Sequence, residues 1–380
     1  MYEKAVSTDS SFVLAWVGLA SSHRRIYWYY YDRSEEQLKR TKEYLDHAIS
    51  LSPNLKEVQL EEGIYYYNSK LDYPKALQIL EPLKSKYPND EKTYQIIGNV
   101  YRKMGDYNKS LEVYNHAISL NPSNYNLWHN NAYTFWYLRK YDDAENCIKR
   151  AIELNPSYHL SQLSLLKLYA NTGQIEKAKS YLKNNQKSID HPDIKVVQAY
   201  IEILDGNYDE ALQIIQSLSE EVLVDLIYYG TKHIQLGIIY HMMSNKEMSV
   251  KHFESEKTIL LSKIDQSDND SRIYRSLGIT YAGLGMKKEA IEAGEKALDI
   301  LSFSNHAMMG FHPEMDMVKI LVMVGDYEHA LSRLEKIINQ TGYITANVLQ
   351  FDPFWNPIRE MEGFKAIINN PKYQVNLSDN

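Results

Sequence analysis

The chain has 380 residues, of which 44% are hydrophobic and 24% are charged, and its formal net charge is −7. This composition is that of an ordinary folded protein and excludes collagen-like and disordered chains, while the acidic balance disfavours a nucleic-acid partner, because phosphate contacts need a basic excess. Glycine and proline are scarce, with 16 and 11 residues, whereas tyrosine is abundant with 32; the shortage of turn residues favours an all-α protein.

Neither a targeting segment nor a membrane span is evident in the sequence. The first ten residues, MYEKAVSTDS, lack the apolar core of a signal peptide, and no run of about 18 apolar residues occurs. Cys147 is the single cysteine, which excludes a disulfide within the chain and fits a reducing compartment. We therefore expect a cytoplasmic protein without a membrane partner.

The start of the chain matches the second half of a repeat that is found further along. Residues 2–10, YEKAVSTDS, align with residues 114–122, YNHAISLNP. Because half of a helix pair cannot bury its apolar face alone, we interpret residues 1–11 as the second-helix remnant of a truncated repeat. We accordingly expect more of the native protein upstream.

Residues 12–53 predict a helix pair with an enlarged connection. Helices are expected over 12–23 and 36–51, and the aromatic run Tyr27–Tyr31 lies between them. We expect this run to pack the connection against the first two helix pairs rather than to form a stacking platform.

Residues 57–156 repeat with a period of 34 residues. The segments align without gaps, and Pro122 and Pro156 stand in the matching sequences SLNPSN and ELNPSY. Small residues such as Gly98 and Ala132 recur where two helices must approach closely, and large residues recur beside them to fill the space. The prolines end the second helix of each unit, because proline cannot donate a backbone hydrogen bond.

The turn inside the repeat also recurs along the chain. It is Gly105-Asp106-Tyr107, and it returns as Gly206-Asn207-Tyr208 and as Gly325-Asp326-Tyr327. Glycine supplies the positive φ angle that ends one helix, and aspartate caps the next helix. The pattern predicts about nine helix pairs in one array over residues 12–340, and it is weakest over 230–258.

The C-terminus breaks the period. In the sequence FDPFWNPIREMEGFKAIINNPKY, Asp352-Pro353 and Asn356-Pro357 read as helix starts. The apolar side chains expected to fill the last open groove are Phe354, Trp355, Ile358, Phe364, Ile367 and Ile368. We predict a C-terminal helical cap over 341–373 and a flexible tail over 374–380.

The 34-residue unit resembles the tetratricopeptide repeat (TPR), whose pattern is W-x2-L-G-x2-Y…A-x3-F…P. The best matching stretch is Tyr94-Gln95-Ile96-Ile97-Gly98-Asn99-Val100-Tyr101, followed by Ala117 and Pro122. The resemblance implies a right-handed α-solenoid in which the first helix of each unit lines a concave groove.

The C-terminal segment is similar to the D-P-x-x-D-P-L-R ending of TPR tails in bacterial regulators, although Asn356 and Ile358 depart from that pattern. Those tails follow winged-helix, kinase or nucleotide-cyclase domains. This resemblance therefore implies an upstream effector domain in the native chain.

The TPR resemblance places six positions of each first helix in the groove, where a protein or peptide ligand is expected. Amide side chains there offer both donors and acceptors to a peptide backbone, and aromatic side chains add a large contact area. We expect Trp136 to be exposed in this groove. The predicted partner-binding residues are Gln95, Asn99, Arg102, Asn126, His129, Asn130, Tyr133, Trp136 and Tyr137.

The carboxylate clamp that some TPR proteins use for chaperone tails is not predicted. Asn99 and Asn130 match its pattern, but Gln95 replaces a lysine, and Leu160 and Ser164 replace a lysine and an arginine. A C-terminal carboxylate would be left unpaired without these cations, which is costly.

Motifs for catalysis and for metal or cofactor binding were not found. The sequence contains no G-x4-G-K-[ST] and no H-E-x-x-H, and its 12 histidines are scattered. We therefore predict no enzyme activity, no cofactor and no metal site, and we expect Cys147 to be a buried, inert thiol.

Several functions remain open at this point. The leading interpretation is a non-enzymatic scaffold that binds a protein or peptide, as the C-terminal sensory or interaction region of a larger bacterial regulatory protein. The alternative is a receptor for a small signalling peptide of the quorum-sensing type, although no N-terminal helix-turn-helix or three-helix bundle precedes Phe12. An enzyme would need convergent titratable groups, and an RNA-binding repeat protein conflicts with the acidic charge.

Overall fold

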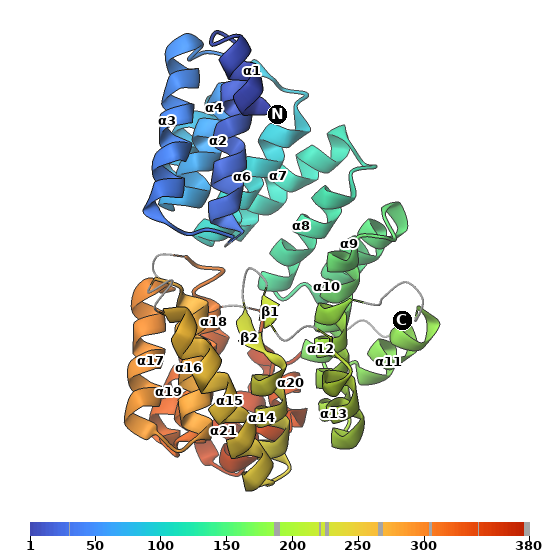
Figure 1. Cartoon of the computed structure of the whole chain (residues 1–380). Helices are drawn as coiled ribbons and strands as arrows, with labels where there is room; N and C mark the ends of the chain where they lie inside the picture. The colour runs from blue at the N-terminus through green and yellow to red at the C-terminus, as the bar shows by residue number, and fades with distance from the viewer. Residues whose placement is uncertain are drawn as a thin grey trace. The chain divides into compact units, whose positions relative to one another are not determined.

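The computed structural model describes residues 1–29, 31–185, 191–219, 222–224, 228–264, 269–303, 306–340 and 342–375. The described residues form helices and one two-stranded hairpin. The chain divides into two compact units, Met1–Pro122 and Ser123–Asn380, which we call unit 1 and unit 2. Within each unit, successive helices pack as joined pairs (Figure 1). The predicted all-α solenoid of TPR-like helix pairs is confirmed.

Unit 1 starts with one short helix, after which the described residues form three helix pairs (Figure 1). Its elements are α1 (Tyr2–Thr8), α2 (Val13–Trp28), α3 (Glu35–Leu51), α4 (Lys56–Tyr65), the π-helical turn η1 (Tyr66–Lys70), α5 (Tyr73–Lys86), α6 (Glu91–Met104) and α7 (Tyr107–Leu120). Leu80 and Leu83 of α5 pack with Ile97 and Val100 of α6 in its core.

Unit 2 contains six helix pairs among its described residues, and the C-terminal elements follow them. The paired helices are α8 (Tyr125–Tyr137), α9 (Tyr141–Leu154), α10 (His159–Asn171), α11 (Ile175–Asn184), α12 (Pro192–Leu204), α13 (Tyr208–Gln216), α14 (Lys232–Met242), α15 (Lys246–Ile264), α16 (Ser271–Gly283), α17 (Lys287–Ile300), α18 (Phe311–Met323) and α19 (Tyr327–Gln340). The C-terminal elements are α20 (Ala346–Phe351), η2 (Pro353–Ile358), α21 (Glu362–Ile368) and η3 (Pro371–Tyr373). None of the helices in the described ranges is both long enough and apolar enough to cross a membrane.

Two glycines of α6 show why the repeat folds as it does. A Cβ atom on Gly98 would lie 2.9 Å from the ring of Tyr114, whose side chain is completely buried in α7. Gly105 ends α6 with a φ of 84°, and the Asp106 carboxylate then accepts a hydrogen bond from the backbone N–H of Lys109 at 3.3 Å. The roles that the sequence predicts for these residues are therefore present in unit 1.

Five of the six apolar side chains expected to fill the last groove are buried in unit 2, and Ile368 is half-buried. Trp355, Ile358 and Phe364 join one cluster with Val318 of α18 and Leu334 of α19. Phe354 and Ile367 belong to the same cluster, and Ile368 packs against it. The limits of the cap at 341 and 373 stay predictions, and residues 376–380 of the expected tail lie outside the described residues.

The structure has two features that the 34-residue period of the sequence does not predict. The boundary between the units falls at Pro122, which is the end of one repeat, whereas the sequence predicts one array over 12–340. A hairpin of β1 (Val222–Val224) and β2 (Tyr229–Thr231), paired antiparallel, precedes α14. Its second strand reaches into residues 230–258, the segment in which the periodic pattern is weakest.

Candidate functional site

The predicted groove residues of unit 1 lie along α6, and two of them hold each other. The Asn99 side-chain oxygen accepts a hydrogen bond from the Arg102 guanidinium at 2.8 Å and another from the Tyr114 hydroxyl at 2.5 Å. Arg102 is only 4% exposed. Gln95 is half-buried, and no hydrogen bond from its side chain to the described residues is found. Gln95 is therefore the residue of this set whose amide stays available to a ligand.

The predicted residues of unit 2 lie along α8 and are partly held by α10. Asn130 donates to the backbone carbonyl of Asn126 at 2.9 Å. The buried His129 contacts Ser161 at 3.1 Å between Nδ1 and Oγ. Asn126 and Asn130 remain half-buried, so this part of α8 presents amide groups at an accessible surface.

Tyr133 is half-buried, and its hydroxyl lies 2.8 Å from the Ser164 hydroxyl of α10. Its ring is parallel to that of Trp136, with an interplanar angle of 8°. Tyr133 thus lies between the half-buried amides of α8 and the buried aromatic residues at the end of the same helix.

Trp136 and Tyr137 are buried rather than exposed, with 1% and 5% of their surfaces accessible. Trp136 belongs to a buried cluster with Ala132 and Tyr141. Tyr343 of the C-terminal segment adds to this cover, because its ring stacks on Trp136 at 5.1 Å between ring centroids and lies 5.9 Å from Tyr137. The expected exposure of Trp136 is thus not what the structure shows, because unit 2 covers this end of α8 with its own chain. The assignment of the nine residues to partner binding stays a prediction.

The covering segment is recognised mainly through its backbone. The Gly342 N–H donates to the Tyr137 carbonyl at 3.1 Å, and the Tyr141 hydroxyl donates to the Gly342 carbonyl at 3.0 Å. The Arg139 guanidinium donates to the Ile344 carbonyl at 3.4 Å and to the carbonyl of Ile338 in α19 at 2.5 Å. The end of α8, the turn after it and the start of α9 therefore bind a polypeptide backbone in this structure.

Unit 2 also encloses a cavity of about 390 Å³. It is lined by α10, α12, α14, α16 and α18 and is bordered by residues from Tyr343 to Trp355. Most lining groups are apolar, as in small-molecule sites, which have volumes of about 300–1,000 Å³. The polar and charged residues of the described lining are Lys167, Asn171, Tyr200, Tyr228, Gln235, Arg275, Ser276, His312, Asp316, Lys319, Tyr343 and Asp352.

Charged groups in the cavity are partly paired. The Arg275 Nε and Nη2 atoms lie 2.7 and 2.6 Å from one oxygen of Asp316, and the Lys319 ammonium lies 3.9 Å from the other. The Tyr200 hydroxyl donates to Asp352 at 2.8 Å. Burial raises the pKa of Asp352 above its ordinary value and that of Tyr200 well above its own.

His312 is the neutral member of this cavity. Burial holds the pKa of its imidazole well below the ordinary value, and the nearby cations Arg275, Lys167 and Lys319 lower it further. Its ring packs against the ring of Tyr343, with centroids 5.6 Å apart. The imidazole can therefore donate one N–H and accept at its other nitrogen at neutral pH.

The nine residues predicted from the sequence do not include these cavity residues, although the period of the repeat locates them. Lys167, Tyr200 and Lys319 each stand six residues before the turn glycine of their own repeat. Asn99 stands at the same distance before Gly105. The positional rule that selects the nine predicted residues, extended to the later repeats, therefore selects the lining of the cavity.

One cluster of metal-binding residue types does not fit an ion. Ligand atoms of His159, His191 and Asp193 lie within 4.8 Å of one another. The two imidazole rings, however, stack with centroids 3.9 Å apart and an interplanar angle of 13°. Because the nitrogen lone pairs lie in the ring planes, two nearly parallel rings cannot both direct a lone pair at one ion between them.

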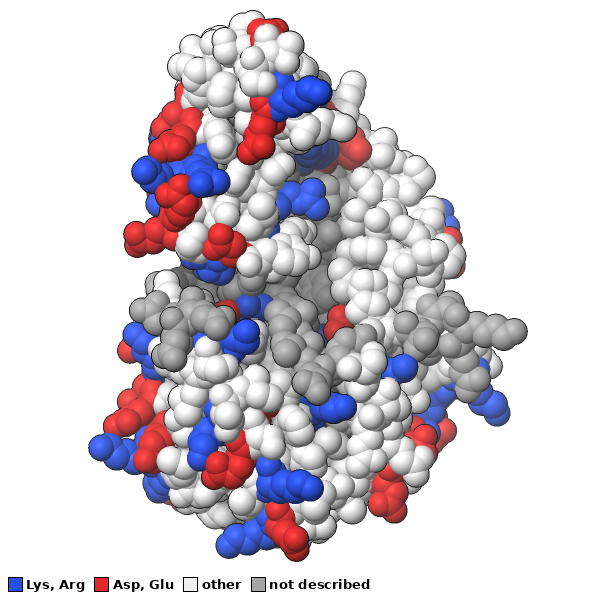
Figure 2. Space-filling model, viewed as in Figure 1, with Lys and Arg blue, Asp and Glu red and all other residues white. Residues whose placement is uncertain are grey.

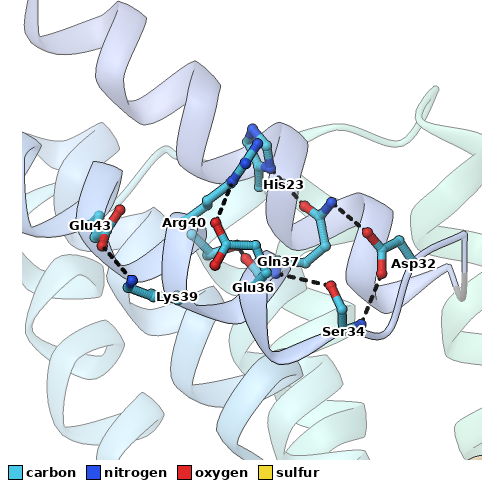
Figure 3. Close-up of polar contacts among 9 residues, drawn as sticks. His23, Asp32, Ser34, Glu36, Gln37, Lys39, Arg40 and Glu43 are labelled. Atoms are coloured by element: carbon cyan, nitrogen blue, oxygen red, sulfur yellow. Dashed lines mark hydrogen bonds and ion pairs between the residues drawn. The ribbon is translucent and has the colours of Figure 1, made fainter. Parts of the chain in front are cut away.

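The enlarged connection of unit 1 is held by a polar chain that Figure 3 shows. The Gln37 side chain donates to Asp32 and contacts His23, each at 2.7 Å, and Asp32 accepts from the Ser34 N–H at 2.9 Å. Ser34 in turn caps α3. These contacts join the end of α2 to the start of α3.

The aromatic run of this connection packs only in part. Trp28 lies 6.4 Å from the ring of Tyr67, between ring centroids, and the Lys103 ammonium lies 4.1 Å from the Trp28 ring centroid. Tyr29 and Tyr31 are exposed, and Tyr30 lies outside the described residues. The predicted packing role therefore holds for Trp28.

Burial, with Arg102 nearby, holds the pKa of Lys103 well below its ordinary value.

Cys147 is buried in α9, and burial raises the pKa of its thiol to about 12. A thiol with so high a pKa is almost entirely protonated near neutral pH, and the thiolate is the reactive form. This environment agrees with the inert thiol that the sequence predicts.

Comparison with protein families matches two repeat models to this chain. One is described as a TPR repeat and covers residues 98–138, and the other is described as a tetratricopeptide repeat and covers residues 129–183. Together they span the end of unit 1 and the start of unit 2.

Parts of the chain are similar in sequence to known proteins. A TPR repeat-containing protein of Methanocaldococcus jannaschii is 32% identical over 116 residues, which are 30% of this chain and 20% of that protein. RNA polymerase II-associated protein 3 of Xenopus laevis is 27% identical over 251 residues, which are 62% of this chain and 34% of that protein. The chain thus spans about a fifth to a third of the length of these relatives.

Among solved structures, a TPR protein of Thermus thermophilus has a TM-score of 0.36 and 22% identity, covering 43% of this chain and 89% of that one. The assignment of the repeat therefore depends on the sequence matches alone. Residues 98–183 of this chain carry tetratricopeptide repeats, a repeat whose proteins serve as scaffolds for protein interaction.

Proposed function

We propose that this chain is a non-enzymatic module that binds a segment of a partner protein along the inner faces of its first helices. The observation that supports the proposal is the binding of residues 342–345 to the end of α8. There, Tyr137, Arg139 and Tyr141 bind backbone groups of the segment, and Trp136 stacks on its tyrosine. Backbone hydrogen bonds combined with side-chain pockets are a general mode of peptide recognition.

The amides of α6 and α8 extend this chemistry to surfaces that the chain leaves accessible. Gln95 in unit 1 and Asn126 and Asn130 in unit 2 are half-buried, so part of each side chain is already ordered by its neighbours. An amide supplies both a donor and an acceptor to an extended backbone. The lost side-chain entropy on binding is correspondingly small, which favours affinity.

A selection from a random peptide library tests this function. The affinity of the selected peptides is then measured for the wild-type chain and for the double variant Asn126→Ala with Asn130→Ala. The control is Asn146→Ala, which removes an exposed amide from α9. Loss of two hydrogen bonds of about 1 kcal/mol each is expected to weaken binding at least about tenfold, whereas the control binds like the wild type. Failure to select a common sequence, or equal affinity for both variants, would contradict the proposal.

We also propose that the module is the sensory or interaction region of a larger bacterial regulatory protein that acts in the cytoplasm. The support is the similarity of the segment around Asp352-Pro353 to the endings of TPR tails that follow effector domains. The native gene tests this context: an effector domain of the winged-helix, kinase or cyclase type upstream of this sequence is expected, and an unrelated neighbour would contradict it.

A second candidate is a receptor for a small signalling peptide. The specific observation that favours it is the cavity of about 390 Å³ in unit 2, which suits a ligand far smaller than a folded partner. Mass spectrometry of peptides that co-purify with the chain from its native cells separates the candidates. One short peptide bound in a one-to-one ratio supports the receptor, and recovery of intact partner proteins alone supports the scaffold.

A further inference from the structure

We propose that the cavity of unit 2 is a binding site for a small organic acid with one carboxylate and an apolar body. The inference does not depend on peptide capture along α6 and α8, because none of the nine residues predicted to bind a partner lines this cavity. Three properties of the lining support the proposal: its apolar surface, its charged side chains and its hydrogen-bond donors.

The apolar body has a matching surface. One side of α14 contributes Ile238, Ile239 and Met242, and Met315 of α18 and Phe354 of η2 add to it. Burial of apolar ligand surface yields roughly 25 cal/mol per Å², so this lining favours a chain or ring of carbon atoms. A fully polar ligand would leave these side chains without a partner.

The charged side chains of the lining favour an anion. Among the described residues of the lining, the cationic side chains are Lys167, Arg275 and Lys319, and the carboxyl groups are Asp316 and Asp352. The Lys319 side chain is 37% exposed, so its ammonium is accessible to a ligand that enters from solvent. A carboxylate near this ammonium gains favourable electrostatic energy.

The hydrogen-bond donors that would bind the ligand's carboxylate are on α18. Arg275 is engaged by Asp316 through two short contacts. The Lys319 ammonium, by contrast, lies 3.9 Å from Asp316, which is beyond hydrogen-bond distance, and no hydrogen bond from it to the described residues is found. The same holds for the ring of His312 among the described residues.

His312 and Lys319 are separated by seven residues, which is about two helical turns, and both line the cavity from the same side of α18. A charge-assisted hydrogen bond from an ammonium to a carboxylate is about twice as strong as a neutral one. Lys319 therefore supplies the charge that selects an acid, and His312 supplies a neutral donor beside it.

The test compares two probes that differ only in charge. Decanoate and 1-decanol are titrated into the full chain by isothermal calorimetry below the concentrations at which either aggregates. Decanoate is expected to bind once per chain and at least tenfold more tightly than decanol. Equal affinity, or no binding of decanoate, would overturn the proposal on the wild-type chain alone.

Variants locate the site. Lys319→Met keeps an apolar side chain of similar length but removes the charge, and it is expected to reduce the preference for decanoate to less than threefold. Lys288→Met is the matched control, because this lysine of α17 is 83% exposed and does not line the cavity. An unchanged preference in Lys319→Met, with helical content preserved in circular dichroism, would overturn the assignment. The peptide selection described above is unaffected by either result.

Discussion

At the scale of single residues, the close packing of two helices in a repeat depends on a small residue, glycine or alanine, at one position of the first helix. Gly98 lies against the ring of Tyr114, and Ala132 stands one period later in the next repeat. The sequence predicts this small position from periodicity alone, because close packing leaves no other choice of residue size.

Gly98→Ala tests that constraint. The added methyl group would lie 2.9 Å from the ring of Tyr114, and overpacking of this kind costs about 1–3 kcal/mol. The gain in helix propensity of about 1 kcal/mol offsets part of this cost. We expect urea unfolding to show a net loss of about 1 kcal/mol.

The control is Asn108→Ala at an exposed position of α7. Its free energy of unfolding should remain within about 0.5 kcal/mol of the wild-type value. A Gly98→Ala variant as stable as this control would show that the two helices can separate without loss.

His312 makes the stability of the chain depend on pH. Its folded-state pKa lies well below the ordinary value of 6.5, so the unfolded chain binds a proton that the folded chain does not. Stability is therefore complete above about pH 6.5 and decreases as the pH falls below it. The groups that face the imidazole are Arg275, Lys167 and Lys319, with Tyr343 against its ring.

His312→Gln is expected to reduce this dependence by up to about 1.4 kcal/mol per pH unit between pH 6 and pH 5. The measurement is the free energy of unfolding of both proteins at several pH values. His159, His241 and His252 also have lowered pKa values owing to burial, so the difference between the two proteins, rather than the wild-type curve, is the relevant quantity. Parallel curves would contradict the argument.

At the scale of elements, the segment from Gly342 to Thr345 fixes the end of α8. Gly342 admits no side chain, because a Cβ atom there would contact the Trp136 carbonyl oxygen and lie 2.9 Å from the Arg139 nitrogen. Thr345 then caps α20 and donates its hydroxyl proton to the Asn171 carbonyl of α10. This segment therefore joins α8, α10 and α20.

Gly342→Ala should displace the segment, because backbone atoms cannot move aside as a side chain can. We expect a loss of about 2 kcal/mol or more in the free energy of unfolding, at the upper part of the range for overpacking. Gly363→Ala is the matched control, since its Cβ atom would meet only the Leu331 side chain at 3.1 Å. Similar losses for the two variants would argue against a special role for the segment.

Periodicity predicts the helices and their inner faces, but it does not predict this segment. The contacts of Tyr343 with Trp136 join residues more than 200 positions apart, and no local pattern records them. The burial of Trp136 therefore differs from the expected exposure partly for a reason that lies outside its own repeat. The hairpin of β1 and β2 is likewise a departure from the repeat.

At the scale of the whole molecule, the composition predicts the fold class and the repeat predicts the order of helix pairs. The division at Pro122 was not predicted, because the period continues across it. The cavity of unit 2 follows from the inner positions of five repeats taken together. Its residues differ in type from one repeat to the next, so comparing repeats for identical residues does not reveal them.

The surface charge fits a role in protein binding. On the face shown in Figure 2, lysine and arginine side chains are interspersed with aspartate and glutamate side chains over both units. Such a mixed surface does not concentrate the positive potential that phosphate backbones require. Specificity is therefore expected to come from the inner faces of the helices rather than from the charge of this face.

The most direct test of the central claim is amide hydrogen exchange of the whole chain with and without a peptide selected from the library. The account predicts slower exchange in α6 or α8, where Gln95, Asn126 and Asn130 stand, and unchanged exchange in the outer helices α7 and α9. Slower exchange confined to α7 and α9, or no change in any helix at saturating peptide, would contradict it.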